Sequence, residues 1–98
     1  MIVDIRKNSK NFLKWYGKIL DSSSNVTNFV PYGFAHGYQT LTDDCEMLYF
    51  HSDYYSKQAS KVIGCFDPKI NIKWPLNAKL ISNKDKSIKN LSNKFKGI

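Results

Sequence analysis

Short runs of alternating apolar and polar residues recur along the chain and are separated by turn residues. The runs occupy residues 2–5, 12–20, 34–41, 45–51, 61–66 and 71–73. Alternation with a period of two places every second side chain on the same face, which is typical of a half-buried β-strand. Short strands at a spacing of roughly ten residues, with turns between them, favour a sandwich or a barrel. The pattern therefore predicts an all-β fold.

The period changes near the end of the chain. Ile88, Leu91 and Phe95 are spaced as on one face of a helix, and Ser87 precedes them as a candidate N-cap. We therefore expect a short C-terminal helix. It would lie in a basic tail at about residues 86–98, because eight lysines and a single acid, Asp85, stand from Lys69 onward.

The net charge of +7 bears on partners rather than on fold class. A lysine-rich stretch confined to one part of a chain is more typical of a solvated surface than of a binding patch. A nucleic-acid site would normally add arginines, and Arg6 is the only arginine. No apolar run approaches the ~20 residues of a membrane span. We expect no nucleic acid and no membrane as partner, and a basic nucleic-acid module is the weakest alternative.

Composition places the chain among single globular domains. Its 98 residues, 42% hydrophobic and 23% charged, fit one domain spanning residues 1–98. Two cysteines, Cys45 and Cys65, do not make a disulfide framework, and their strand-like surroundings predict buried free thiols. No signal peptide is visible, so we expect a cytoplasmic protein. Because a strand pattern begins at the first residue, we also expect that another segment normally precedes it.

The candidate chemistry lies in the middle of the chain and is open to several readings. Metal sites use roughly three or four ligands, so His36 and His51 alone predict neither a metal nor a cofactor. Along a strand, Cys45 and His51 would lie ~20 Å apart, which disfavours a cysteine nucleophile. Tyr49, His36 and Asp85 would combine an acid, an imidazole and a carboxylate. The alternative is an aromatic stripe in the core, because spacing does not show that the three converge.

Five motifs, in order, resemble those of the dTDP-4-dehydrorhamnose 3,5-epimerases. They are residues 29–37 (FVPYGFAHG), 46–49 (EMLY), 53–55 (DYY), 67–75 (DPKINIKWP) and 80–85 (LISNKD). Residues 3–6 (VDIR) and 12–17 (FLKWYG) resemble the strand pair that precedes them, so the likeness covers about residues 2–86. The resemblance implies a cupin, a jelly-roll β-barrel that is usually a dimer and needs no metal or cofactor.

The resemblance also implies a reaction and a role for each matching residue. The substrate would be a dTDP-4-keto-6-deoxy sugar, serving dTDP-rhamnose and surface polysaccharide synthesis, with epimerisation at C3 and C5 or at C3 only. Tyr49 would be the acid that returns the proton, and Asp85 would orient and charge-pair a basic histidine. The side chains implied to line the substrate pocket are His36, Tyr54, Tyr55 and Lys84.

One part of the family pattern is absent from the chain. The family's basic histidine stands in a motif of the form Arg-Gly-x-His-x-Gln, and no such motif occurs here. The chain therefore resembles the C-terminal half of an epimerase, and we expect it to be inactive in isolation. It would pair with a copy of itself, bind a separate N-terminal half, or be the remnant of a broken reading frame. The alternative function is a non-catalytic nucleotide-sugar-binding or assembly module.

Overall fold

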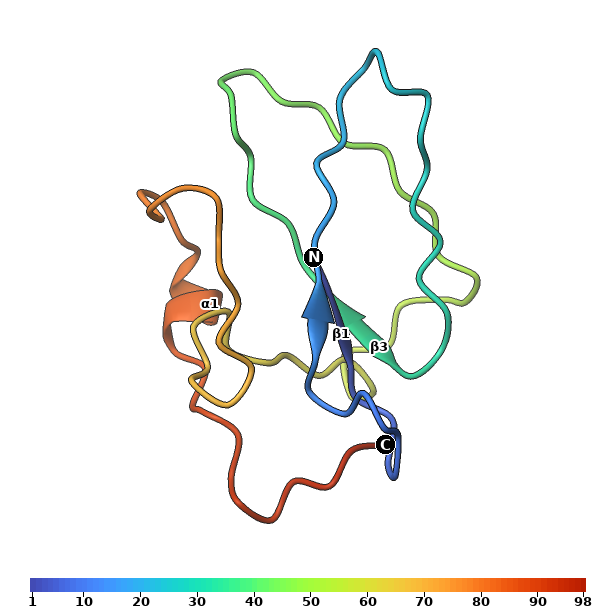
Figure 1. Ribbon diagram of the computed structural model, residues 1–98, viewed down its shortest axis with the longest axis vertical. Helices are drawn as coiled ribbons and strands as arrows, with labels where there is room; N and C mark the ends of the chain where they lie inside the picture. Colours follow the sequence, from blue (N-terminus) through green and yellow to red (C-terminus); the bar gives the residue numbers. More distant parts are fainter.

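A three-stranded antiparallel sheet near the N-terminus is the only sheet of the protein (Figure 1). The computed structural model describes residues 1–98. The strands are β1 (Ile2–Asp4), β2 (Trp15–Tyr16) and β3 (Phe34–His36), in the spatial order β2-β1-β3, and the one helix is α1 (Asn83–Lys86). The prediction of an all-β fold is confirmed in this coarse form, since the sheet is antiparallel and only one helical turn is present.

The central strand is short but well paired. Val3 lies opposite Trp15 of β2 and Ala35 of β3, and it is one of only two buried apolar side chains. β-Branched residues suit this position because their stiff side chains pack well on a pleated surface. The ladder continues past β1, since the Met1 carbonyl accepts a hydrogen bond from the Gly37 amide at 3.1 Å.

Several predicted strands are absent, which corrects the sequence-based prediction. Of the runs 12–20 and 34–41, only the parts opposite β1 are strands, and residues 45–51, 61–66 and 71–73 form none. Residues 45–51 make no backbone–backbone hydrogen bond at all. A strand persists only where a neighbouring strand offers backbone donors and acceptors. Residues 45–51, 61–66 and 71–73 therefore have no strand to pair with in this chain.

The helix predicted on Ile88, Leu91 and Phe95 is absent, and the one helical turn of the protein, α1, lies before these residues. Ser82, not Ser87, is its N-cap: the Ser82 hydroxyl accepts from the Asp85 amide at 3.1 Å and donates to Asp85 Oδ2 at 2.7 Å. The Ser82 side chain thus caps the helix by accepting from the N3 amide, as N-cap serines commonly do. Ser87 is instead the C-cap.

The apolar residues of the basic tail pack on the body of the protein instead of forming a helical face. Phe95 stacks on Phe12 with 5.9 Å between ring centroids. The Ile98 amide donates to the Ile5 carbonyl at 2.8 Å, and the Ile98 carbonyl accepts from the Lys7 amide at 2.9 Å. The tail therefore returns to the end of β1, as Figure 1 shows in red. Tertiary pairing overrode the helical spacing here.

Few side chains are buried. Val3 and Ile70 are the buried apolar residues, and Asp4 and Asp67 are the buried polar ones. Asp67 accepts hydrogen bonds from the backbone amides of Lys69 and Leu91, so it joins its own turn to the basic tail. Cys65 is half-buried, but Cys45 is exposed, contrary to the prediction of two buried thiols, because no strand partner covers residues 45–51. No helix is long and apolar enough to cross a membrane.

Candidate functional site

Tyr49, the predicted acid, lies in an extended segment without regular structure. Its side chain is 64% exposed. Its aromatic neighbour is His51, with ring centroids 5.4 Å apart and an angle of 78° between the ring planes. An edge-to-face pair of this kind is a favourable aromatic contact. The imidazole in contact with Tyr49 is thus that of His51, whereas the sequence pattern pointed to His36.

Asp85, the predicted dyad carboxylate, is exposed and lies in the first turn of α1, where its amide donates to the N-cap Ser82 hydroxyl. Its Oδ2 accepts the Ser82 hydroxyl, and its Oδ1 has no hydrogen-bond partner. The preceding Lys84 is also exposed, and its carbonyl accepts the Ser87 hydroxyl at 2.8 Å. Both side chains of this helical turn are therefore free to meet a substrate or a second polypeptide.

The other predicted pocket residues are exposed and lie apart. His36 is the last residue of β3 and stands opposite Ile2. Tyr54 and Tyr55 are 96% and 77% exposed. No hydrogen bond, ion pair or ring contact joins any two of the six predicted site residues. In Figure 1 the lime-coloured segment after residue 45 lies across the molecule from α1, so the structure of this chain alone does not assemble the six.

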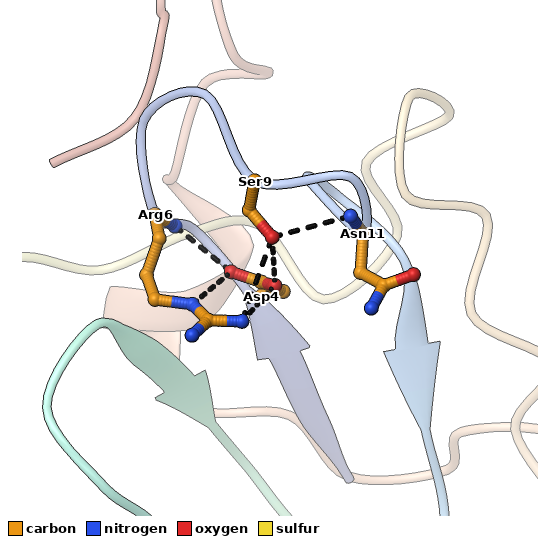
Figure 2. A network of polar contacts seen from close by, with 4 residues as sticks. All are labelled: Asp4, Arg6, Ser9 and Asn11. Carbon is orange, nitrogen blue, oxygen red and sulfur yellow. Dashed lines mark hydrogen bonds and ion pairs between the residues drawn. The ribbon is translucent and has the colours of Figure 1, made fainter.

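The densest polar cluster lies elsewhere, and sequence analysis did not single it out. Figure 2 shows Asp4 accepting hydrogen bonds from Arg6 Nε at 3.0 Å, from Arg6 Nη2 at 2.8 Å and from the Ser9 hydroxyl at 2.7 Å. The Arg6 amide also donates to Asp4 at 3.0 Å, and Ser9 accepts from the Asn11 amide at 3.2 Å. The available signal was an acid and a base two residues apart at the end of a predicted strand, a spacing that places both on one face where the backbone stays extended.

The electrostatics of this cluster follow from its geometry. The Arg6 side chain holds the pKa of Asp4 well below its usual range, with a smaller contribution from Ser9, while burial opposes the shift. Asp4 in turn raises the pKa of Arg6. A carboxylate that is 3% exposed yet accepts four hydrogen bonds stays ionised because donors replace the lost water.

Outside the cluster around Asp4, the Cys45 thiol also has a shifted pKa, which lies below its usual value. A hydrogen bond with the Thr42 hydroxyl, 3.2 Å from Sγ, is the largest cause of its lowered pKa. Sγ also donates to the Thr42 carbonyl at 3.1 Å. Asp43 opposes the shift, so the acidic turn limits formation of the thiolate.

Several hollows mark the surface, and the two described next contain no predicted site residue. The larger, about 450 Å³ and open to solvent, is lined by Phe12, Leu13, Lys14, Trp15, Lys69 and Ile70. The smaller, about 160 Å³, is lined by Met1, Ile2, Tyr16, Lys18, Asn28 and Phe29. No cluster of three or more histidine, cysteine, aspartate or glutamate side chains could hold a metal ion.

Comparison with known proteins gives one consistent result. The chain matches the family described as dTDP-4-dehydrorhamnose 3,5-epimerase over residues 1–93. It is 42% identical over 83 residues to the dTDP-4-dehydrorhamnose 3,5-epimerase of Shigella flexneri, covering 85% of this chain and 46% of that protein. For the proteins of the same name from Neisseria gonorrhoeae and Methanothermobacter thermautotrophicus, identity is 42% over 84 residues and 38% over 92.

The alignments differ in how much of each relative they cover. They span 85% and 91% of this chain but 26% of the Neisseria protein and 50% of the Methanothermobacter protein. The chain thus spans about half the length, or less, of these curated relatives. No solved structure matches it.

Proposed function

Because this chain belongs to the dTDP-4-dehydrorhamnose 3,5-epimerase family, we propose that it supplies one part of an epimerase acting on dTDP-4-keto-6-deoxyglucose. The observation that carries the proposal is the family match over residues 1–93, which contains all six predicted site residues. The name that these relatives share, dTDP-4-dehydrorhamnose 3,5-epimerase, supports the nucleotide-sugar substrate. In this proposal residues 1–98 are one domain, the C-terminal portion of a cupin jelly roll, acting in the cytoplasm without a cofactor.

The chemistry required is proton removal and return next to a ketone. The protons at C3 and C5 of a 4-keto sugar are acidic because the C4 carbonyl takes up the electron pair as an enolate. A base removes the proton from one face, and an acid delivers one to the other face, so that the configuration inverts. Tyr49 is the proposed acid: a phenol with a usual pKa near ~10 donates readily to a carbanion but stays protonated in water. The enolate oxygen needs a hydrogen-bonding or cationic partner.

The proposed base lies outside residues 1–98. Asp85 can orient and charge-pair a basic histidine, but the family motif Arg-Gly-x-His-x-Gln that carries this histidine is not present in the sequence. A second copy of the same chain lacks the motif as well. We therefore propose a partner that bears the N-terminal half of the family fold, with or without pairing between copies of this chain.

Unpaired backbone supports such a partner. The protein has 23 backbone–backbone hydrogen bonds for 98 residues. Compact domains form roughly one internal hydrogen bond per residue, about two-thirds of them within the backbone. Residues 45–51 keep their alternating pattern and their free backbone groups, as expected of a strand whose neighbour belongs to another chain. In a strand, Leu48 and Phe50 would lie on the face opposite Tyr49; they are 82% and 88% exposed, which fits an apolar face that another polypeptide covers.

Solvent-deuterium exchange at C3 and C5 of dTDP-4-keto-6-deoxyglucose tests the proposal. The isolated chain should incorporate no deuterium because it lacks the base. Addition of the N-terminal half of the Shigella relative should start exchange with inversion. Tyr49→Phe in the mixture should abolish the inversion, because the base alone returns a deuteron only to the face from which it took the proton. Clear exchange by the isolated chain would contradict the missing base. A stable mixed complex without exchange would contradict the proposed epimerase.

A non-catalytic nucleotide-sugar-binding or assembly module is the second candidate. It is favoured by the two exposed tyrosines, Tyr54 and Tyr55, together with the absent base motif. Such a module would bind dTDP measurably by calorimetry, and Tyr49→Phe would leave that binding nearly unchanged. Substitution of Tyr55 by alanine would weaken it, because a stacked base loses its aromatic platform.

A further inference from the structure

The Arg6 side chain joins the end of the central strand to β3. Its Nε and Nη2 atoms bind the two carboxylate oxygens of Asp4 at 3.0 and 2.8 Å, a bidentate arrangement that fixes the plane of the guanidinium (Figure 2). The same guanidinium lies over the ring of Phe34, with its central carbon 4.7 Å from the ring centroid. A cation over an aromatic face at this distance is attracted by the ring quadrupole.

The turn before β3 is shaped to admit the stem of Arg6. Gly33 has φ of +91°, and a Cβ added there would lie 2.5 Å from Arg6 Cγ. The Gly33 carbonyl also accepts the Ile5 amide at 3.0 Å. A side chain at position 33 would displace Arg6 from Phe34, so the position of Arg6 over the ring depends on the glycine.

β3 has few other restraints. It contains only three residues: Phe34 lies opposite Asp4 and His36 lies opposite Ile2. The Asp4–Arg6–Phe34 contact holds the start of the strand, and the backbone ladder holds its end. The His36 side chain makes no hydrogen bond of its own. Its direction is therefore set by the register and twist of β3 relative to β1.

We propose that Arg6 is a positioning residue for His36, acting through Phe34 to fix β3 on β1. His36 as a neighbour of the sugar rests on the proposed function, whereas the mechanical link from Arg6 to His36 does not. Asp4 and Ser9 hold the guanidinium, the guanidinium holds Phe34, and Phe34 fixes the strand that ends at His36.

The imidazole resonances of the two histidines test this link in the 98-residue chain. His51, paired edge-on with Tyr49 in a different segment, is the internal reference. Arg6→Gln keeps the methylene groups beside Gly33 but removes the positive charge and the bidentate guanidinium. It should shift and broaden the His36 resonances while those of His51 stay in place. Arg6→Lys keeps a cation near the ring and should return His36 part of the way to its wild-type position. Lys7→Gln removes one positive charge from the neighbouring exposed residue and should change neither histidine.

The outcomes separate this inference from the proposed function. Unchanged His36 resonances in folded Arg6→Gln would overturn the link, as would equal shifts of both histidines, since these indicate a general loss of structure. Global unfolding of Arg6→Gln would also contradict a role limited to positioning. None of these readouts depends on turnover. A failed deuterium exchange would therefore remove the epimerase proposal and leave the link between Arg6 and His36 standing.

Discussion

At the scale of single residues, Asp4 is the most heavily bonded side chain of the protein. It is buried, and it accepts hydrogen bonds from Arg6 and Ser9 on both carboxylate oxygens. Because these donors favour the charged form, the pKa of Asp4 lies below its value in an unfolded chain. A carboxyl group with a depressed pKa in the folded state stabilises the fold above its unfolded pKa of ~4. The contribution is lost as the pH falls through the folded pKa.

Asp4→Asn should therefore destabilise the protein most near neutral pH. As the pH falls below ~4, the difference in unfolding free energy between wild type and variant should narrow, because protonation weakens the wild-type network in the same way. Chemical denaturation at a series of pH values measures this. Asp43→Asn, at an exposed turn carboxylate, is the control and should show a small, nearly constant difference. A difference in unfolding free energy between wild type and Asp4→Asn that stays constant down to low pH would contradict a stabilising role for the ionised Asp4 carboxylate.

At the scale of elements, the basic tail holds distant parts of the chain together. The Leu91 amide donates to Asp67, Phe95 stacks on Phe12, and Ile98 pairs with the backbone on either side of Arg6. The last contact is close: Gly97 has φ of +94°, and an added Cβ would lie 2.5 Å from the Ile5 carbonyl oxygen. The family match ends at residue 93, so this closure is a feature of this chain rather than of the matched family region.

Gly97→Ala should release the tail from β1. A left-handed conformation costs an alanine roughly 1–2 kcal/mol, and the clash is with backbone, which cannot turn aside. The midpoint of thermal unfolding should fall by several degrees, at about 4–8 °C for each kcal/mol in a domain of this size. Gly64→Ala is the matched control, because its added Cβ would meet atoms only at 3.8 Å or beyond. Equal midpoints for the two variants would show that the tail does not dock in solution.

At the scale of the whole molecule, the chain is less compact than its length allows. Its radius of gyration is 14.2 Å, against roughly 13 Å for a compact domain of about 100 residues. Only Val3 and Ile70 are buried apolar side chains, and large apolar residues such as Leu48, Phe50 and Phe29 face solvent. A chain in this state gains little from hydrophobic burial by itself, so association offers the larger stabilisation.

Light scattering coupled to size-exclusion chromatography should therefore show association that rises with concentration. Leu48→Ser with Phe50→Ser should reduce it, because both side chains are exposed and contribute little to the fold of the single chain. Val26→Ser, at a partly exposed loop position outside the five motifs, should not. A well-folded monomer at all concentrations, unchanged by the double variant, would count against both pairing between copies and a complementary half.

The sequence predicted some features from neighbouring residues alone and missed those that depend on distant ones. The strand at Ile2–Asp4 and the turn at Gly33 follow from local pattern, and both are present. The spacing of Ile88, Leu91 and Phe95 predicted a helix that is absent, because the tail packs on distant parts of the chain. The helical turn at Asn83–Lys86, capped by Ser82, was not predicted. The six predicted site residues remain a prediction, because each is identified by its motif whereas their convergence depends on strand pairing.

By itself, the sequence determined the family, the all-β class and the residue types available for chemistry. These depend on ordered motifs and on period-two alternation, which are written in adjacent residues. Only the tertiary structure decided that Arg6 lies between Asp4 and Phe34, and that the tail returns to Ile5. The contacts of Arg6 with Phe34 and of Ile98 with Ile5 join residues far apart in sequence, where the gain from hydrogen bonding and packing must exceed the entropy of closing a long loop. The pattern of neighbouring residues does not indicate which distant pairs gain enough free energy to offset that entropy.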